Sequence, residues 1–410
     1  MKKSIRNRIF SSTTALVTTA ALLASGLGTA GADPIEPGQP VPLWSGMDVS
    51  HYRGHIPQKN GTLLREVPLD KGAWLPAASK ASRILYTSQN SRGKMAVSTG
   101  AIFLPKKPAP AGGYPIVAWA HGTVGLGDAC TPSAGDRYLR DVKYLDHWLN
   151  QGYAVVATDY VGLGTPGLMA YLDGKTSAHN VVDSVIAAQR STLAKFSPKW
   201  VVVGQSQGGG VAMNTARYAT EFGKGSGVDY RGGVSTGTPA HIEDILQFAG
   251  PHFPPFDVGA GMTTYILYVL AGFRDARPDM KVNQVLNKEG LKWVKQSETL
   301  CYGSLHKALE DQNVSLHTLF AKPLLSLPGI HKALQEYMGT PASGYDRPIF
   351  VGQGLKDVDV PAPFAISLVT EMYLRGEPVE FYLYPNYDHS QTVNGSLKDS
   401  TPFVARVMQG

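Results

Sequence analysis

Short apolar segments alternate with segments of helical spacing along much of this chain, and this alternation restricts the fold more than any other feature. Continuous apolar strands separated by helices are typical of a parallel sheet that is covered on both faces. Strands are predicted at residues 82–88, 95–104, 116–120, 154–158, 200–203, 232–237, 348–352 and 379–384. Helices are predicted at residues 138–149, 177–193, 211–222 and 362–374. The pattern predicts an α/β fold with a mostly parallel central sheet.

The alternation stops between residues 241 and 346, where the sequence is mostly helical in pattern and carries several prolines. Such a segment predicts a helical cap inserted into the sheet, which divides the core into residues 81–240 and 347–410. Residues 33–80 are rich in Pro and Gly and predict an extended N-terminal segment.

The N-terminus has the layout of a secretory signal. Four basic residues fall within the first eight, an apolar run follows over residues 13–27, and Ala30-Gly31-Ala32 supplies the small residues of a cleavage site. An uncleaved membrane anchor is the alternative, but a spanning helix needs about 20 apolar residues. We expect cleavage near Ala32 and export to the cell envelope or the medium.

The positive charge of the chain comes largely from this signal. Removal of residues 1–32 takes away four basic residues and no acidic one, so the formal net charge falls from +6 to +2. A nearly balanced mature chain gives no electrostatic basis for nucleic-acid binding.

The chain has two cysteines, Cys130 and Cys301. In an exported protein, an even pair without C-x-x-C spacing favours a disulfide. Two buried free thiols are the alternative.

Ser206 lies at the centre of Gly204-Gln205-Ser206-Gln207-Gly208, between the strand at 200–203 and the helix at 211–222. A nucleophile elbow requires this strand–turn–helix context, and its tight turn requires small residues two positions before and after the serine. The alternative is a Gly-rich phosphate loop, but the segment lacks the Lys of that motif. The sequence therefore predicts Ser206 as a catalytic nucleophile.

A serine nucleophile needs a general base and an orienting carboxylate, and in this fold the chain order is Ser, acid, His. His389 follows the last strand and is the predicted base. Asp357 follows the preceding strand and is the predicted acid, with Asp359 as the alternative. Asp388 is adjacent to His389 and is poorly placed to reach its ring. The other histidines after Ser206 lie in the predicted cap and are interpreted as surface or packing residues.

Two backbone N–H groups are expected to form the oxyanion hole. Gln207 directly follows the serine, and Thr123 lies in the loop after the strand at 116–120. His121 in the same loop is interpreted as structural, and Asp159-Tyr160 at the end of the next strand is expected to brace the loop.

The predicted cap contains a very apolar stretch, residues 258–273. It could line an acyl-chain pocket or give the cap transient contact with a lipid interface, because soluble proteins rarely expose a large apolar patch without a purpose. A buried cap helix is the equally weighted alternative.

These motifs resemble the secretory lipase family, which includes the fungal lipase A type and actinobacterial relatives. The matching segments span much of the mature chain: residues 119–125, 158–164, 204–209, 354–357 and 388–389. The resemblance implies an α/β-hydrolase core, a large helical cap between the sixth and seventh core strands, and hydrolysis of hydrophobic esters. It also supports Ser206, Asp357 and His389 as the triad. The His121-Gly122-Thr123 segment resembles the bacterial branch, which argues against a fungal-type acyl tunnel.

The predicted activity is hydrolysis of acylglycerols or similar carboxylic esters through an acyl-enzyme on Ser206, with no metal or organic cofactor. The alternatives are a secreted acyltransferase with the same triad, a peptidase on the same scaffold, and a non-catalytic lipid-binding homologue. The predicted partners are small-molecule or lipid esters.

Overall fold

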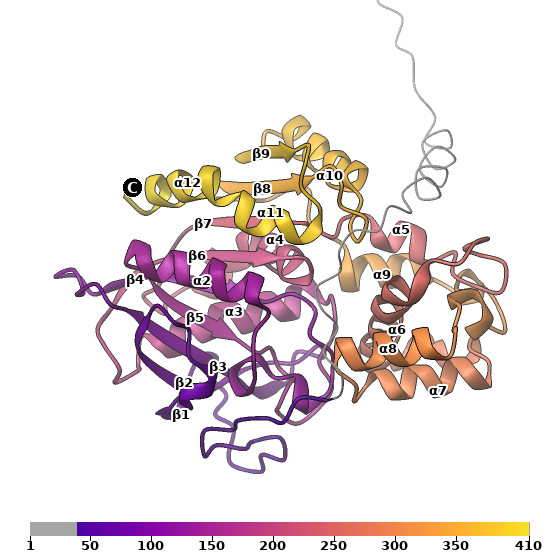
Figure 1. Ribbon diagram of the computed structural model, residues 1–410, viewed down its shortest axis with the longest axis horizontal. Coiled ribbons are helices and arrows are strands. Elements are labelled where there is room, and N and C mark those ends of the chain that lie inside the picture. Colours follow the sequence, from indigo (N-terminus) through magenta and orange to yellow (C-terminus); the bar gives the residue numbers. More distant parts are fainter. Residues whose placement is uncertain (1–38, 410) are drawn as a thin grey trace, which may run out of the picture. The chain divides into compact units, whose positions relative to one another are not determined.

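A nine-stranded, mostly parallel sheet forms the centre of the molecule (Figure 1). The computed structural model describes residues 39–409, so the predicted signal at residues 1–32 lies outside the described residues. The strands follow the order β1-β2-β3-β5-β4-β6-β7-β8-β9 across the sheet. Their bounds are β1 Leu63–Pro68, β2 Ala78–Gln89, β3 Met95–Pro105, β4 Tyr114–Ala120, β5 Ala154–Thr158, β6 Phe196–Gln205, β7 Asp229–Thr236, β8 Ile349–Gly354 and β9 Val379–Tyr384.

The pairing changes direction once across the sheet. β1, β2, β3 and β5 pair antiparallel, whereas every pair from β5 through β4 to β9 is parallel. The predicted α/β-hydrolase architecture is therefore confirmed. Strand β1 was not predicted, because its central Arg65-Glu66 gives an edge strand a polar character.

Side chains of the central strands alternate between two apolar layers, as expected for a sheet covered on both faces. Ile116 and Ala118 of β4 belong to the same apolar cluster as residues of α3 (Gly174–Ala188), α4 (Gln207–Phe222) and α10 (Ala362–Leu374). Val117 and Trp119 face the other way, toward α2 (Leu139–Gln151) and α12 (Leu397–Gln409). The short helix α11 (His389–Gly395) contributes Val393 to this second layer.

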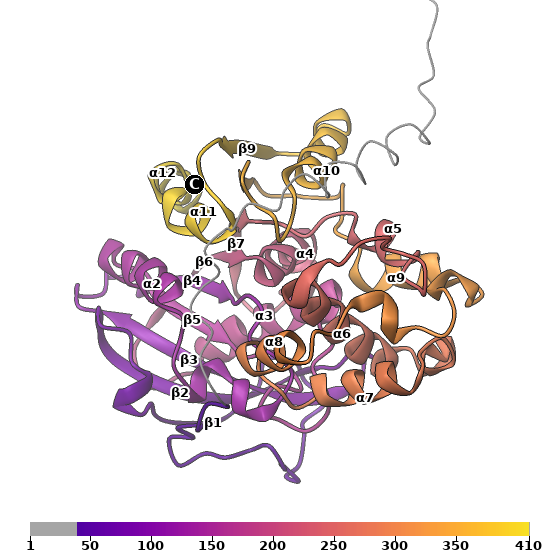
Figure 2. The same ribbon diagram turned by 45° about the vertical axis from the view of Figure 1, so that its right-hand side comes forward.

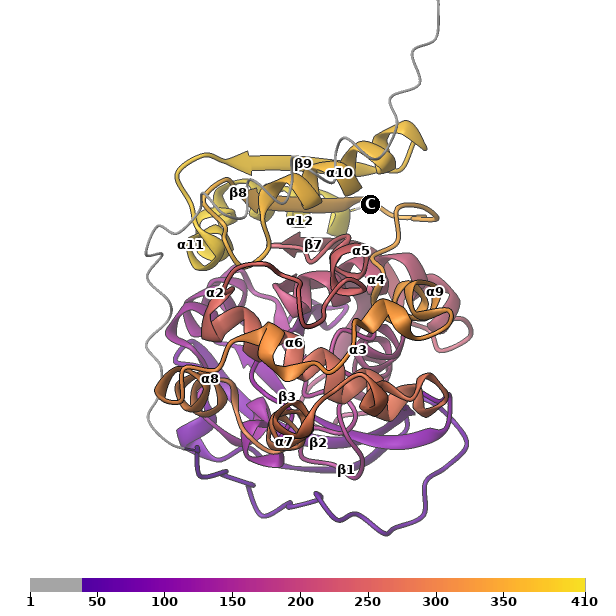
Figure 3. The ribbon, with the colours of Figure 1, turned by 90° about the vertical axis from the view of Figure 1, so that its right-hand side faces the viewer.

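Five α-helices lie in the chain between β7 and β8, in the region predicted as a cap. They are α5 Ile242–Leu246, α6 Gly259–Ala276, α7 Lys288–Ser297, α8 Tyr302–Asp311 and α9 Ile330–Met338. Figures 1 and 2 show them gathered beside the end of the sheet, and the view in Figure 3 has them in front of it. Because β1 precedes the predicted strands, this insertion follows the seventh strand rather than the sixth.

The very apolar stretch within this insertion forms the buried helix α6. Leu267, Tyr268, Leu270 and Phe273 are each fully buried, and they belong to the same apolar cluster as α3 and α4. The exposed apolar patch considered from the sequence is therefore not formed by this helix. No helix among residues 39–409 is both long and apolar enough to span a membrane.

The predicted disulfide is present and ties the insertion to the loop after β4. Cys130 and Cys301 are bonded, with their Cα atoms 5.3 Å apart across 171 positions of sequence. The backbone N–H of Tyr302 also donates to the carbonyl of Val124 at 2.9 Å. The alternative of two free thiols is wrong.

Candidate active site

Ser206 stands at a strained turn between β6 and α4. Its φ of 58° and ψ of −125° lie in a region that residues other than glycine rarely adopt. A Cβ atom at Gly204 would lie 2.0 Å from the carbonyl oxygen of Gly208, and one at Gly208 would lie 1.9 Å from that of Ala120. The two glycines therefore allow the turn to close against the end of β4, as a nucleophile elbow requires.

Asp357 lies in the loop after β8, and His389 is the first residue of α11, which follows the neighbouring strand β9. The Nδ1 atom of His389 lies 2.7 Å from Oδ2 of Asp357, and both side chains are buried. The other carboxylate oxygen of Asp357 accepts the backbone N–H groups of Asp359 at 3.0 Å and Val360 at 2.8 Å. These bonds hold the carboxylate in one orientation toward the imidazole.

The alternative carboxylates have other contacts. The Oδ1 atom of Asp359 lies 3.3 Å from the hydroxyl of Tyr265. Asp388 caps α11, where its side chain accepts the backbone N–H of Gln391 at 2.8 Å. The structure therefore brings Asp357, the preferred candidate, to the Nδ1 atom of His389.

Two opposing effects act on the pKa of His389. Burial favours the neutral ring and lowers the pKa, whereas the adjacent Asp357 carboxylate and its hydrogen bond favour the imidazolium, and the net result is a raised pKa. Because Nδ1 donates its hydrogen to Asp357, the Nε2 atom of the neutral ring is the acceptor. That is the nitrogen a general base would use.

The Nε2 atom of His389 has a partner that sequence reasoning missed. The side-chain Nε2 of Gln205, the residue before the predicted nucleophile, lies 2.8 Å from it. The predicted nucleophile Ser206 is the next residue along the chain from this contact. The sequence shows a polar residue beside the serine, but no local pattern predicts that its side chain contacts His389.

The loop after β4 approaches the elbow closely. A Cβ atom at Gly122 would lie 2.9 Å from Oε1 of Gln205 and 3.6 Å from Cβ of Ser206. The hydroxyl of Thr123 is 2.5 Å from that of Tyr171, and this hydrogen bond orients the Thr123 side chain. Gln207 is the first residue of α4, and the first N–H groups of a helix have no acceptor within it.

His121 is a packing residue of the same loop, as interpreted from the sequence. Its ring is buried, with Nδ1 2.7 Å from the carbonyl of Gly122 and Nε2 3.3 Å from that of Asp159. It packs against the ring of Tyr160 at a tilt of 33°, and the hydroxyl of Tyr160 donates to the carbonyl of His121 at 3.2 Å. Burial lowers the pKa of His121. Asp159 and Tyr160 thus contact the loop that they were expected to brace.

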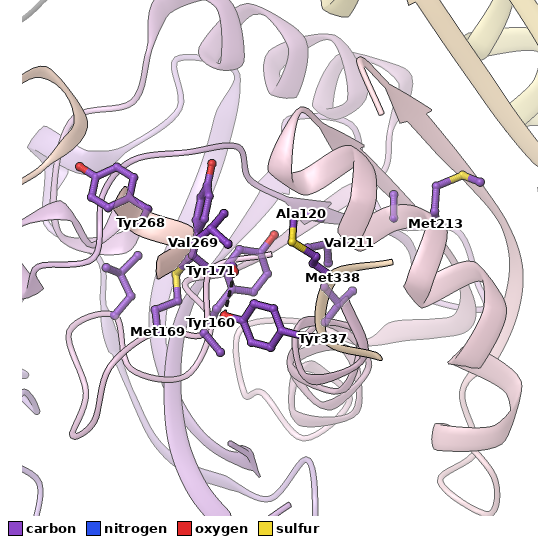
Figure 4. Packing of buried hydrophobic residues seen from close by; sticks show 14 of the residues in the cluster. Ala120, Tyr160, Met169, Tyr171, Val211, Met213, Tyr268, Val269, Tyr337 and Met338 are labelled. Carbon is purple, nitrogen blue, oxygen red and sulfur yellow. Dashed lines mark hydrogen bonds between the residues drawn. The ribbon is translucent and has the colours of Figure 1, made fainter. Parts of the chain in front are cut away.

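A small cavity of about 10 Å³ lies between α4 and the cap helices. Gln207 lines it, together with Val211 of α4 and Met338 of α9. The last two are labelled in Figure 4. Within the described part of the chain, neither polar atom of the Gln207 carboxamide has a hydrogen-bond partner. The cavity has the size of about one water molecule, so the cap closes tightly over this side of the elbow.

The cap also contacts the loop that holds Tyr171. The hydroxyl of Tyr337 in α9 donates to the carbonyl of Tyr171 at 2.9 Å, as the dashed line in Figure 4 shows. Tyr171 in turn contacts Thr123. A hydrogen-bonded chain therefore connects the cap to the predicted oxyanion loop.

Two groups of side chains in residues 39–409 have ligand atoms within 4.8 Å of one another, the spacing that a metal ion could bridge. One is Asp357, Asp359 and His389, in which Nδ1 of His389 is already engaged by Asp357. The other is His241, Glu243 and Asp244, where His241 forms an ion pair with Asp244 at the surface of the cap. Neither group is assigned as a metal site.

Several known proteins resemble this chain. The family model described as "Secretory lipase" matches residues 139–315. No curated protein matches by sequence. Among solved structures, Candida antarctica lipase A in its closed state has a TM-score of 0.69 at 21% identity, over 87% of this chain and 85% of that one.

Two bacterial structures are similar over comparable lengths. The ligand-bound rice cell wall degrading esterase LipA from Xanthomonas oryzae has a TM-score of 0.63 at 19% identity, over 85% of this chain and 97% of that one. A putative hydrolase from Legionella pneumophila has a TM-score of 0.67 at 19% identity, over 84% and 98%. At such identities the likeness shows the shared fold. The match of the secretory lipase model to residues 139–315 agrees with the predicted resemblance and with a carboxylic ester hydrolase.

Proposed function

We propose that the protein is a secreted serine lipase or carboxylesterase that cleaves hydrophobic carboxylic esters through an acyl-enzyme on Ser206. The observation that carries the proposal is the buried 2.7 Å contact between Asp357 and His389, beside a serine held at φ 58°. The names of the similar proteins, a lipase and an esterase, support the same reaction class.

In the proposed mechanism, the neutral His389 accepts the proton of Ser206 at Nε2 while the serine oxygen attacks the ester carbonyl. Asp357 stabilises the resulting imidazolium, and the backbone N–H groups of Gln207 and Thr123 bind the oxyanion. The imidazolium then protonates the leaving alcohol. Water, activated by His389, releases the acid and regenerates Ser206.

The decisive experiment replaces the nucleophile. Ser206→Ala should abolish hydrolysis of p-nitrophenyl esters and covalent labelling by a serine-reactive phosphonate, while circular dichroism and the melting temperature stay close to those of the parent. Unchanged turnover in a correctly folded Ser206→Ala protein would refute the assignment. A panel of esters from acetate to palmitate then measures the acyl-length preference.

Transient contact of the cap with a lipid interface is part of this proposal. Because α6 is buried, such a contact has to involve other residues, and Phe248 and Leu325 of the insertion are 37% and 48% exposed. Comparing activity on emulsified triglyceride and on a soluble ester, for the parent and for a Phe248→Ser/Leu325→Ser double variant, tests it. Equal losses on both substrates would argue against an interfacial role.

Export of the mature chain is also proposed. The disulfide between Cys130 and Cys301 supports it, because such bonds persist in oxidising compartments. Sequencing the N-terminus of the protein recovered from culture medium would locate the cleavage site, which we expect near Ala32.

A further inference from the structure

The contact between Gln205 and His389 has a consequence for the resting enzyme. A neutral imidazole offers one acceptor nitrogen with one lone pair. With Nδ1 donating to Asp357, that acceptor is Nε2, and the side-chain amide of Gln205 points its nitrogen at it from 2.8 Å. The hydroxyl of Ser206 needs the same lone pair before it can lose its proton.

We propose that Gln205 is a positioning residue that competes with Ser206 for the Nε2 atom of His389 and keeps the unoccupied site in a resting state. This inference rests on the proposed triad and adds a step to it. The Gln205 amide has to move off Nε2 before the Ser206–His389 hydrogen bond forms, so a fraction of the free enzyme is unreactive at any moment.

Packing explains why the amide stays at the ring. Gln205 is 1% exposed, and its Oε1 lies close to Gly122, where an added Cβ would be only 2.9 Å away. Within residues 39–409 this Oε1 has no hydrogen-bond partner. The contact with His389 therefore satisfies the amide nitrogen of this buried side chain, and a buried donor without a partner is costly.

The surrounding charges do not remove the competition. The charged groups that act on the ring are Asp357 and Asp359 from the loop after β8, and Arg140 from α2. The two carboxylates favour the imidazolium and Arg140 opposes it. A donor on Nε2 stabilises the neutral ring instead, so loss of the Gln205 amide should raise the pKa of His389 further.

Three replacements of Gln205 separate this role from simple packing. Gln205→Met keeps the length but has no donor, and Gln205→Asn keeps the amide but is one methylene too short to reach Nε2. Gln205→Glu places an acceptor at the ring and should hold His389 as the imidazolium. The readouts are the rate of phosphonate labelling and the pH profile of kcat/KM, with melting temperature as the folding control.

One hydrogen bond is worth roughly a threefold to tenfold change in an equilibrium. We therefore expect the phosphonate to label Gln205→Met and Gln205→Asn about threefold to tenfold faster than the parent on the alkaline plateau. The acid limb of their kcat/KM profiles should move to higher pH by about half to one unit. Glu should be slower than the parent at neutral pH and should recover at alkaline pH. At neutral to alkaline pH, we expect labelling to be fastest for Gln205→Met and Gln205→Asn, slower for the parent and slowest for Gln205→Glu.

The outcomes distinguish this inference from the proposed triad. If Ser206→Ala still labels, the triad itself is wrong. If Ser206→Ala abolishes labelling but folded Met and Asn variants label more slowly than the parent, or leave the acid limb in place, the competition is refuted while the triad stands. If Met folds poorly, the comparison of Asn with Glu still decides the question, because both retain a polar side chain.

Discussion

Two loops at the end of the sheet each bury a histidine, but the physical environments of His121 and His389 differ. Both ring nitrogens of His121 face backbone carbonyls, and burial lowers its pKa. His389 faces the carboxylate of Asp357, which outweighs burial and raises its pKa. A buried histidine thus becomes a candidate base when a charged partner stabilises its protonated form, and a packing residue when it has only neutral acceptors.

The loops are also held differently. The loop that carries His121 is tied to the cap by the Cys130–Cys301 bond and by the Tyr302–Val124 backbone hydrogen bond. Asp357 and His389 contact each other through their side chains, and the segments that carry them are also joined by the backbone hydrogen bond from Lys356 to Tyr387 at 3.1 Å. The first loop is therefore tied to the cap, whereas the segments of the second pair are tied to each other.

The largest expected effect separates the two histidines directly. His389→Ala should lower kcat/KM for a soluble ester by roughly 10⁴- to 10⁶-fold, because the base of a triad acts as one unit with its nucleophile. The melting temperature should change by only a few degrees. A loss of less than a hundredfold would mean that His389 is not the base.

Removing the disulfide tests the support of the first loop. A Cys130→Ala/Cys301→Ala variant should lose about 4–5 kcal/mol of unfolding free energy on the chain-entropy model, as measured by denaturant titration. Under conditions where the variant remains folded, kcat/KM should fall far less than in His389→Ala. An unchanged denaturation midpoint would show that the other cap contacts suffice.

His121→Asn is the matched counterpart of the His389 variant. The neutral ring donates to one buried carbonyl, so its loss should cost about 1–3 kcal/mol of stability, again read by denaturant titration. We expect kcat/KM to fall by less than about tenfold at temperatures where the variant is folded. A loss that matches His389→Ala would assign His121 to the chemistry and remove the contrast.

The smallest expected effect concerns pH. His389 must be neutral to accept a proton, and its pKa is raised, so kcat/KM should fall as the pH drops through a midpoint above the usual histidine value of about 6.5. Asp357→Asn removes the stabilising carboxylate and should move this midpoint to lower pH while the plateau also falls. A midpoint that moves upward in Asp357→Asn would contradict the pairing.

Much of the fold could be predicted because its determinants are local. Continuous apolar runs such as residues 154–158 match β5 at the bounds predicted, and the helix at 362–374 is α10 as predicted. The edge strand β1 was missed, since one exposed face and a charged centre remove the apolar signal. The short helix α11 and the C-terminal α12 also lay beyond the predicted elements.

The sequence by itself determined the candidate catalytic residues: a glycine-flanked serine between a strand and a helix, followed in order by an acid and a histidine. Strand and turn patterns depend on neighbouring residues, so they can be recognised without coordinates. Tertiary structure alone decided which atoms meet. It packed α6 inside rather than at the surface, set Asp357 rather than Asp359 against His389, and placed the amide of Gln205 on the acceptor nitrogen. Those contacts join residues up to 184 positions apart, and packing of whole layers, not local pattern, brings them together.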